Sequence, residues 1–182
     1  SYLIEYEIIP GQVQRINVTP GWNAIAIYLQ PKEASVGKYL KDKAYRSIFT
    51  ISGQAWDFGL NEGSAVNVTS FKPGEGYLID SAENFSIEIP GKPVELPYRL
   101  DLHAGWNMIG LPVNETVDLG NITVNADHKR YRYPEAAEKG LVSAFIWRYE
   151  GDNWRHLAEN ETLAPGVAYL FESTGEAKLE FR

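Results

Sequence analysis

The sequence contains no cysteine at any of its 182 positions. This absence excludes disulfide bonds, thiol nucleophiles and thiolate metal sites together. It fits a cytosolic protein, or an extracellular one whose hydrophobic core is large enough to fold without disulfides.

Long apolar runs and positive charge are also scarce. No stretch of 18 apolar residues occurs, so we expect no membrane insertion within this segment. The formal net charge of -7 argues against a nucleic-acid partner, because phosphate binding needs clustered Lys and Arg. The chain begins at Ser1 without Met or a signal peptide, which we interpret as a processed protein or a part of a longer one.

Residues that could carry chemistry are few. The chain has 3 histidines, His103, His128 and His156, and their spacings match no metal signature. No nucleophile or acid/base motif accompanies them. We therefore predict no catalytic residue, no metal ligand, no cofactor and no enzymatic activity.

What the sequence does contain is an internal repeat. The Gly-Trp-Asn segment at residues 105–112 has a counterpart at residues 21–27, and each reads as a glycine turn that enters a strand with two apolar faces. Such a strand is expected to lie centrally, covered on both sides. Three further pairs of segments match in the same order: hairpins at 48–56 and 146–154, Pro-Gly turns at 71–78 and 163–170, and closing strands at 85–89 and 177–181.

The repeat predicts a mainly β fold made of two tandem homologous units, each a β-sandwich or barrel-like unit with one short helix. The first unit is expected over residues 1–90, with an extra N-terminal strand at 2–9. A Pro-rich linker over 91–97 is expected to lead to the second unit at 98–182. The helices, each opened by a proline, are expected at residues 31–43 and 134–140.

Six tripeptides have the Asn-x-Ser/Thr form of a glycosylation acceptor. Their asparagines are Asn17, Asn67, Asn84, Asn114, Asn121 and Asn160. Independent placement of the 11 Asn and 17 Ser or Thr would give roughly one such tripeptide. The alternative is that Asn and Thr merely cluster in turns, but the excess favours a surface selected to carry glycans, and hence an exported protein. Solvent-exposed Asn side chains are then expected.

Aromatic residues lie beside both hairpin turns. Trp56, Tyr149 and Trp154 are candidates for stacking against sugar rings. The alternative is that these rings fill the core, which the equivalent positions of Trp56 and Trp154 in the two units favour.

The segment 127–133 is the one basic, aromatic patch, and it interrupts the second unit. It could meet an anionic glycan or a neighbouring protomer. A solvated loop is the reading that we favour for such a run of charges.

The ordered motifs resemble a family of tandem modules found in archaeal, and some bacterial, cell-surface and secreted proteins. The family signature has a GWN-(hydrophobic)-I-x-L-P opening, a Y-x-G-x-x-W hairpin and a PG-x-G-Y close. These correspond here to residues 105–112, 149–154 and 73–77, with a degenerate close at 165–169 that has Ala168 in place of its middle glycine. The first unit also lacks the proline of the opening. The resemblance implies an envelope-associated β module, often near surface-layer or adhesin-like chains, and it does not imply an enzyme.

The resulting hypothesis is a non-catalytic, extracellular module of an archaeal cell-surface or surface-layer-associated glycoprotein. Its partners would be other envelope proteins or glycans, including further copies of itself. The alternative is a carbohydrate-binding module of a secreted hydrolase, in which Trp56 or Trp154 would stack on sugar.

Overall fold

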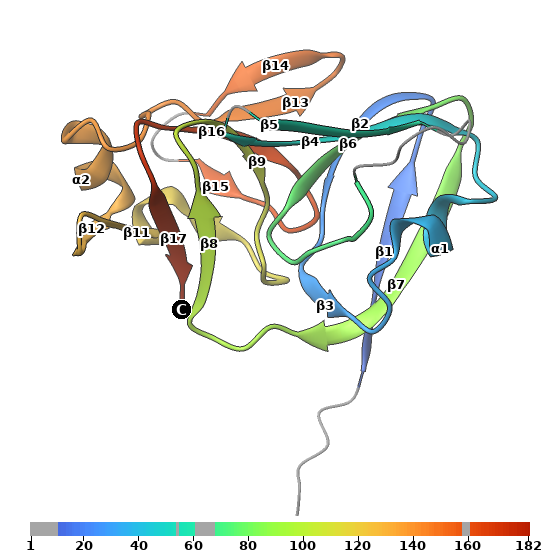
Figure 1. Cartoon of the computed structure of the whole chain (residues 1–182), viewed down its shortest axis with the longest axis horizontal. Coiled ribbons are helices and arrows are strands. Elements are labelled where there is room, and N and C mark those ends of the chain that lie inside the picture. The colour runs from blue at the N-terminus through green and yellow to red at the C-terminus, as the bar shows by residue number, and fades with distance from the viewer. Residues whose placement is uncertain (1–10, 54, 61–67, 158–160) are drawn as a thin grey trace, which may run out of the picture.

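The computed structural model describes residues 11–53, 55–60, 68–157 and 161–182, and for 55–60 it describes the backbone alone. Within these residues the protein is mainly β, with several sheets and two short α-helices. The largest sheet runs along the top of Figure 1, and smaller sheets lie below it at either end. The strand expected at 2–9 lies outside the described residues.

The largest sheet has eight strands and combines segments from both halves of the chain. The first half supplies β2 (Gly21–Ala26), β4 (Tyr45–Gly53), β5 (Ala55–Leu60) and β6 (Gly76–Ser81). The second half supplies β9 (Gly105–Ile109), β13 (Trp147–Glu150), β14 (Asn153–His156) and β16 (Tyr169–Ser173). Strand β4 joins the two sets, because one of its edges pairs with β5 while the other pairs first with β6 and then with β9.

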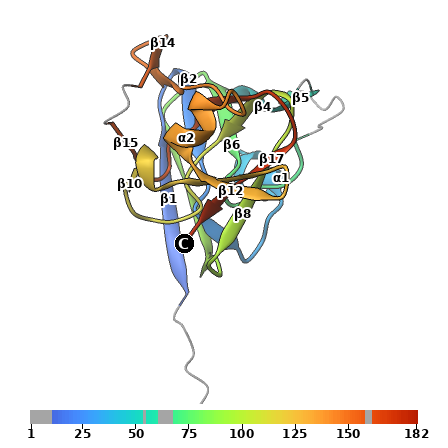
Figure 2. The same ribbon diagram turned by 90° about the vertical axis from the view of Figure 1, so that its left-hand side faces the viewer.

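Three smaller sheets complete the described part of the fold. A three-stranded sheet at the right of Figure 1 contains β1 (Gln12–Val18), β7 (Phe85–Pro93) and β3 (Leu29–Pro31), in that order. A four-stranded sheet at the left contains β12 (Lys129–Arg132), β11 (Thr123–Ala126), β17 (Ala177–Phe181) and β8 (Tyr98–Leu102). Strand β12 of that sheet lies toward the viewer in Figure 2. The last sheet pairs β10 (Val117–Asp118) with β15 (Thr162–Leu163).

The helical segments are α1 (Val36–Leu40), α2 (Tyr133–Glu138) and the 3-10 helix η1 (Leu119–Asn121). Pro134 lies in the first turn of α2, as predicted. The prediction that Pro31 opens a helix is wrong, because Pro31 ends the edge strand β3, where a missing N–H group is tolerated. Strand β7 runs on to Pro93, so residues 91–93 of the expected linker belong to a sheet.

The Gly-Trp-Asn turns have a simple physical basis. Gly21 and Gly105 have φ values of 92° and 106°, a conformation that glycine adopts without a steric penalty. Two residues later the Asn107 side chain closes the turn: Nδ2 donates to the His103 carbonyl at 2.9 Å, and Oδ1 accepts from the His103 N–H at 3.0 Å. Asn23 makes the same pair of bonds to Thr19, at 2.8 and 3.0 Å.

Each turn then pairs with a later strand in the same register. Gly21 lies opposite Ser81 in the β2–β6 pair, and Gly105 lies opposite Ser173 in the β9–β16 pair. The hydroxyl groups of both serines donate to a carbonyl two residues ahead, at 2.7 Å in each case.

The Pro-Gly turns are held by a buried tyrosine in the strand that follows. The hydroxyl oxygen of Tyr77 accepts the Lys72 N–H at 3.0 Å, and that of Tyr169 accepts the Ala164 N–H at 2.8 Å. Burial is the main cause that raises the pKa of both phenols, so both stay protonated.

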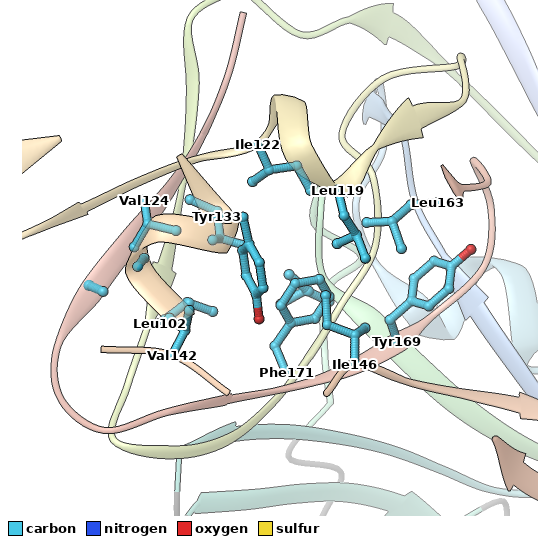
Figure 3. Close-up of a cluster of buried hydrophobic side chains, with 14 of the residues drawn as sticks. Leu102, Leu119, Ile122, Val124, Tyr133, Val142, Ile146, Leu163, Tyr169 and Phe171 are labelled. Carbon is cyan, nitrogen blue, oxygen red and sulfur yellow. The ribbon is translucent and has the colours of Figure 1, made fainter. Parts of the chain in front are cut away.

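Hydrophobic packing divides between the halves. One cluster contains only residues between Ile16 and Ile89, and another contains only residues between Leu102 and Phe181. In the second cluster, drawn in Figure 3, the rings of Tyr133 and Phe171 meet edge to face with their centroids 5.8 Å apart. Each half therefore buries an apolar core of its own.

The halves meet through reciprocal backbone contacts. The Ala26 N–H donates to the Gly166 carbonyl at 3.0 Å, and the Gly110 N–H donates to the Gly74 carbonyl at 2.9 Å. Ala26 and Gly110 each stand five residues after the glycine of a Gly-Trp-Asn turn, and Gly74 and Gly166 belong to the two Pro-Gly turns. The strand after the Gly-Trp-Asn turn of each half thus contacts the Pro-Gly turn of the other half, so the same type of contact forms twice.

Candidate functional site

The described sequon asparagines all lie at the surface. Asn17 is on β1, Asn84 precedes β7, Asn114 follows β9 and Asn121 ends η1, and each is exposed. The remaining two, at positions 67 and 160, lie outside the described residues. Four of the six candidate positions therefore meet the steric requirement for carrying a sugar.

Two of these acceptor sequences touch each other across the β1–β7 pair. Asn17 lies opposite Ser86, the hydroxyl residue of the Asn84 sequon, and the Ser86 hydroxyl donates to Asn17 Oδ1 at 2.7 Å. Arg15 also donates to this oxygen, at 3.3 Å. The folded chain therefore holds the Asn17 carboxamide against the strand.

The aromatics of the second hairpin lie on the face of the large sheet that points away from the two main cores. Tyr149 and Trp154 are paired across β13 and β14, with ring centroids 5.4 Å apart, and both are partly exposed. Trp154 also packs against a small buried cluster that includes Ile51 and Met108. It is therefore part core residue and part surface residue. The backbone of Trp56 pairs with Ile51, but its side chain lies outside the described part.

The tryptophans of the Gly-Trp-Asn turns are more exposed than Tyr149 and Trp154. Trp22 is 41% exposed and Trp106 is 37% exposed. They project from the same sheet face as Met108, because side chains alternate along a strand. The expectation of two covered faces is therefore wrong at these positions, and β2 is an edge strand rather than a central one. Along each strand, alternation puts the Trp side chain on the face opposite to that of the inward Asn. This alternation was the sequence signal for the exposure of the two tryptophans.

The histidines are all exposed and lie apart from one another in the chain. His103 Nδ1 lies 2.8 Å from Glu176 Oε2. The His156 ring packs edge-on against the Phe145 and Trp147 rings. The described residues hold no grouping of His, Asp and Glu that could bind a metal ion.

The basic segment at 127–133 differs from its predicted form. It is not a loop but a hairpin, in which the turn at Asp127 and His128 leads into β12 and then α2. Both turn residues adopt positive φ, 50° and 61°, as two-residue hairpin turns require. The pairing of β12 with β11 brings Arg130 onto a sheet surface.

That surface contains a buried carboxylate, Glu180, whose side chain is 0% exposed. Its Oε1 accepts from Arg182 Nε at 2.8 Å, and its Oε2 accepts from Arg99 Nε at 2.8 Å and Asn125 Nδ2 at 3.1 Å. Arg130 NH2 lies 3.4 Å from Oε1. The hydrogen bonds from Arg182 and Arg99 lower the pKa of Glu180 to about 2, so the group is ionised at neutral pH.

Sequence reasoning singled out the basic segment but missed the rest of this network. Glu180 and Arg99 are 81 positions apart, so no local motif contains both. The one available signal was the alternation in the last strand, which puts Glu180 on the outward face between Leu179 and Phe181.

An open groove of about 910 Å³ lies on this surface and is lined by Arg99, Asp101, Lys129, Arg130 and Lys178, among others. Both cationic and carboxylate groups line it. Its surroundings can therefore offer both strong hydrogen-bond donors and strong acceptors to a polar ligand.

Within the described part of the chain, no helix is both long enough and apolar enough to cross a bilayer. No family model, no curated protein and no solved structure matches the chain.

Proposed function

We propose that the chain is a non-catalytic, extracellular module of an archaeal cell-surface or surface-layer-associated glycoprotein. The observation that carries this proposal is the exposure of Asn17, Asn84, Asn114 and Asn121 in a sequence that has six acceptor tripeptides. Each of these carboxamides meets the steric requirement for a bulky sugar, so the excess of acceptor tripeptides is matched by positions that a glycosyltransferase could reach. Neighbouring envelope proteins or glycans, including other copies of the chain, are the proposed partners.

The architecture in this proposal is a duplication of one β unit. Three features that recur in both halves support it. They are the Asn side-chain hydrogen bonds that close the Gly-Trp-Asn turn, the serine that pairs with the glycine of that turn, and the tyrosine that holds the Pro-Gly turn. The separate apolar cores point the same way. Two copies related by the reciprocal contacts would resemble an isologous dimer fused into one chain.

The most strongly perturbed titratable groups have structural partners, which supports a scaffold rather than a catalyst. Glu180 links three strands of one sheet and the arginine that follows them. Tyr77 and Tyr169 hold turns, and the Tyr133 hydroxyl donates to the Ser143 carbonyl at 2.7 Å. Perturbed groups can also mark active sites, but here each one is used within the fold.

The test is the intact mass of the protein isolated from its native host, followed by peptide mapping. We expect glycan mass on the peptides that contain Asn84, Asn114 and Asn121. In a host that modifies Asn-x-Ser/Thr, Thr116→Ala should remove the Asn114 glycan while leaving the asparagine in place. The exposed Asn153 is a matched control, because it is followed by Trp and Arg and should stay unmodified. Unmodified asparagines throughout the native protein would refute the glycoprotein proposal.

A second candidate function is carbohydrate binding through the outer aromatic face, as in a module of a secreted hydrolase. The exposed rings of Trp22 and Trp106 favour it, because both stand on the sheet face that carries Trp154. Affinity electrophoresis in gels containing neutral polysaccharides tests the idea. Trp106→Ala should abolish any retardation without a large change in melting temperature, whereas Phe145→Ala, at another exposed ring, should not. Equal mobility of all variants in every gel would exclude this candidate.

A further inference from the structure

The outward face of the four-stranded sheet carries two cross-strand rows of polar and charged side chains. The first row is Arg132, Thr123, Glu180 and Arg99. The second row is Arg130, Asn125, Lys178 and Asp101. Neighbours within a row belong to adjacent strands, so their side chains lie close enough to act on one ligand.

This face has an excess of positive charge in a chain whose formal net charge is -7. Each row contains two cationic side chains and one carboxylate. Arg182 adds a further guanidinium beside Glu180. An anion that approaches the protein therefore finds a local attraction here that the chain as a whole does not offer.

The buried carboxylate of Glu180 does not occupy all the N–H donors of the arginines around it. Arg99 and Arg182 each direct Nε toward Glu180, and Arg130 directs one terminal nitrogen. A guanidinium group has five N–H donors in a planar fork, so each side chain keeps donors for a second partner. The side chains of Arg99 and Arg130 are 51% and 52% exposed, which places them within reach of a ligand. Glu180 thus acts as a buried anchor that orients them.

The groove described above gives this face its shape. Asp127 and His128 at the hairpin tip and Glu176 are among its lining residues. Asp101 pairs with Lys178 at 2.7 Å, so carboxylates are interspersed among the cations. Carboxylates accept hydrogen bonds from hydroxyl groups, while guanidinium groups bind carboxylate or sulfate.

We propose that this groove binds an acidic oligosaccharide, with Arg99 and Arg130 holding a carboxylate or sulfate group and the neighbouring acidic side chains accepting its hydroxyl groups. A sugar chain with both group types matches the mixed lining. Nucleic acid fits less well, because a DNA backbone offers phosphates but no hydroxyl groups that could donate to Asp101, Asp127 and Glu176. The site does not depend on modification of the sequons.

The experiment is calorimetric titration of the whole chain at low salt with four probes: oligogalacturonate, sulfated dextran, neutral dextran and oligothymidylate. The first two distinguish a carboxylate from a sulfate as the bound group. We expect at least one of them to bind more tightly than neutral dextran, and its affinity should fall as salt rises. If both acidic sugars bind no more tightly than neutral dextran, or if oligothymidylate binds more tightly than both, the proposal is overturned.

Variants then assign the site. Arg130→Gln should weaken binding of the acidic sugar by about three- to tenfold, because it removes one charge-assisted contact from a half-exposed position. Arg130→Lys should recover part of that loss if charge alone matters, and little if the planar fork is needed. Lys129→Gln provides a second variant that leaves the bonds to Glu180 intact. The matched control is Arg155→Gln, on β14 of the eight-stranded sheet, and it should bind the acidic sugar as the parent does. Unchanged binding by both Arg130→Gln and Lys129→Gln would place the ligand elsewhere and refute the assignment.

Discussion

Replacement of Gly110 by alanine probes the contact that joins the two halves. Gly110 is buried, and a Cβ atom added there would overlap the Cβ of Ala26 and lie 2.9 Å from the Val167 carbonyl oxygen. The backbone atoms on both sides are held by the hydrogen bonds that exchange between the halves, so neither can move away freely. Glycine is required at position 110 because there is no space for a Cβ atom, and not because the backbone has an unusual φ.

The expected loss is large for a single methyl group. Overpacking of a tight interior typically destabilises by about 1–3 kcal/mol. For a chain of this length, a loss of that size lowers the melting temperature by roughly 2–4 °C per kcal/mol. Equilibrium unfolding in urea, followed by circular dichroism, measures the free energy of unfolding directly.

A second change separates this steric effect from others. Ala26→Gly alone should destabilise by about 1–2 kcal/mol, since it removes a fully buried methyl group and frees the unfolded backbone. When Ala26→Gly is combined with Gly110→Ala, the Cβ atom of residue 26 that would overlap the new Cβ is absent. Glycine and alanine have then exchanged places between two counterpart positions of the two halves. The double variant should be more stable than the sum of the single changes implies, by at least about 1 kcal/mol.

The matched control is Gly37→Ala in helix α1, where the nearest atom to a new Cβ is Ser35 Oγ at 3.7 Å. It should stabilise the protein by about 0.5–1 kcal/mol, because the unfolded chain loses freedom and no clash arises. The reasoning fails if Gly110→Ala is as stable as the parent, or if the effects of Gly110→Ala and Ala26→Gly are simply additive.

Two further predictions concern the buried polar groups. The folded-state pKa of Glu180, about 2, lies below the ordinary glutamate value of 4.5, so the stability contributed by this group is complete above about pH 4.5 and is lost as the pH falls toward 2. Urea titrations between pH 6 and pH 2 should show a shallower decline for Glu180→Gln than for the parent, and parallel curves would contradict the assignment. Tyr169→Phe should destabilise by about 1–3 kcal/mol, because the Ala164 N–H loses its acceptor inside the protein. Tyr77→Phe should lower the free energy of unfolding by a similar amount in the first half. Unchanged stability of both variants would show that these turns do not need the tyrosine hydrogen bond.

Much of the local structure could be predicted from the sequence. The closing strand at 177–181, the hairpin around Gly151 and the first-turn proline of α2 lie where the pattern placed them. Alternation of apolar and polar residues, glycine φ preferences and proline geometry act over a few residues, so a single segment contains the whole signal. The sequence also predicted a mainly β fold, because its segments are short and separated by turns.

Tertiary structure decided how those segments associate. Strand β4 pairs with both β6 and β9, and thereby builds one sheet from the two halves, which no property of its own residues requires. The exposure of Trp106 and the burial of Glu180 likewise reverse what residue type alone would suggest. Glu180 became a buried anchor only because strand register placed Arg99 beside it from 81 positions away. Register is fixed by the combined packing of distant segments, and therefore by information that no local stretch of sequence carries.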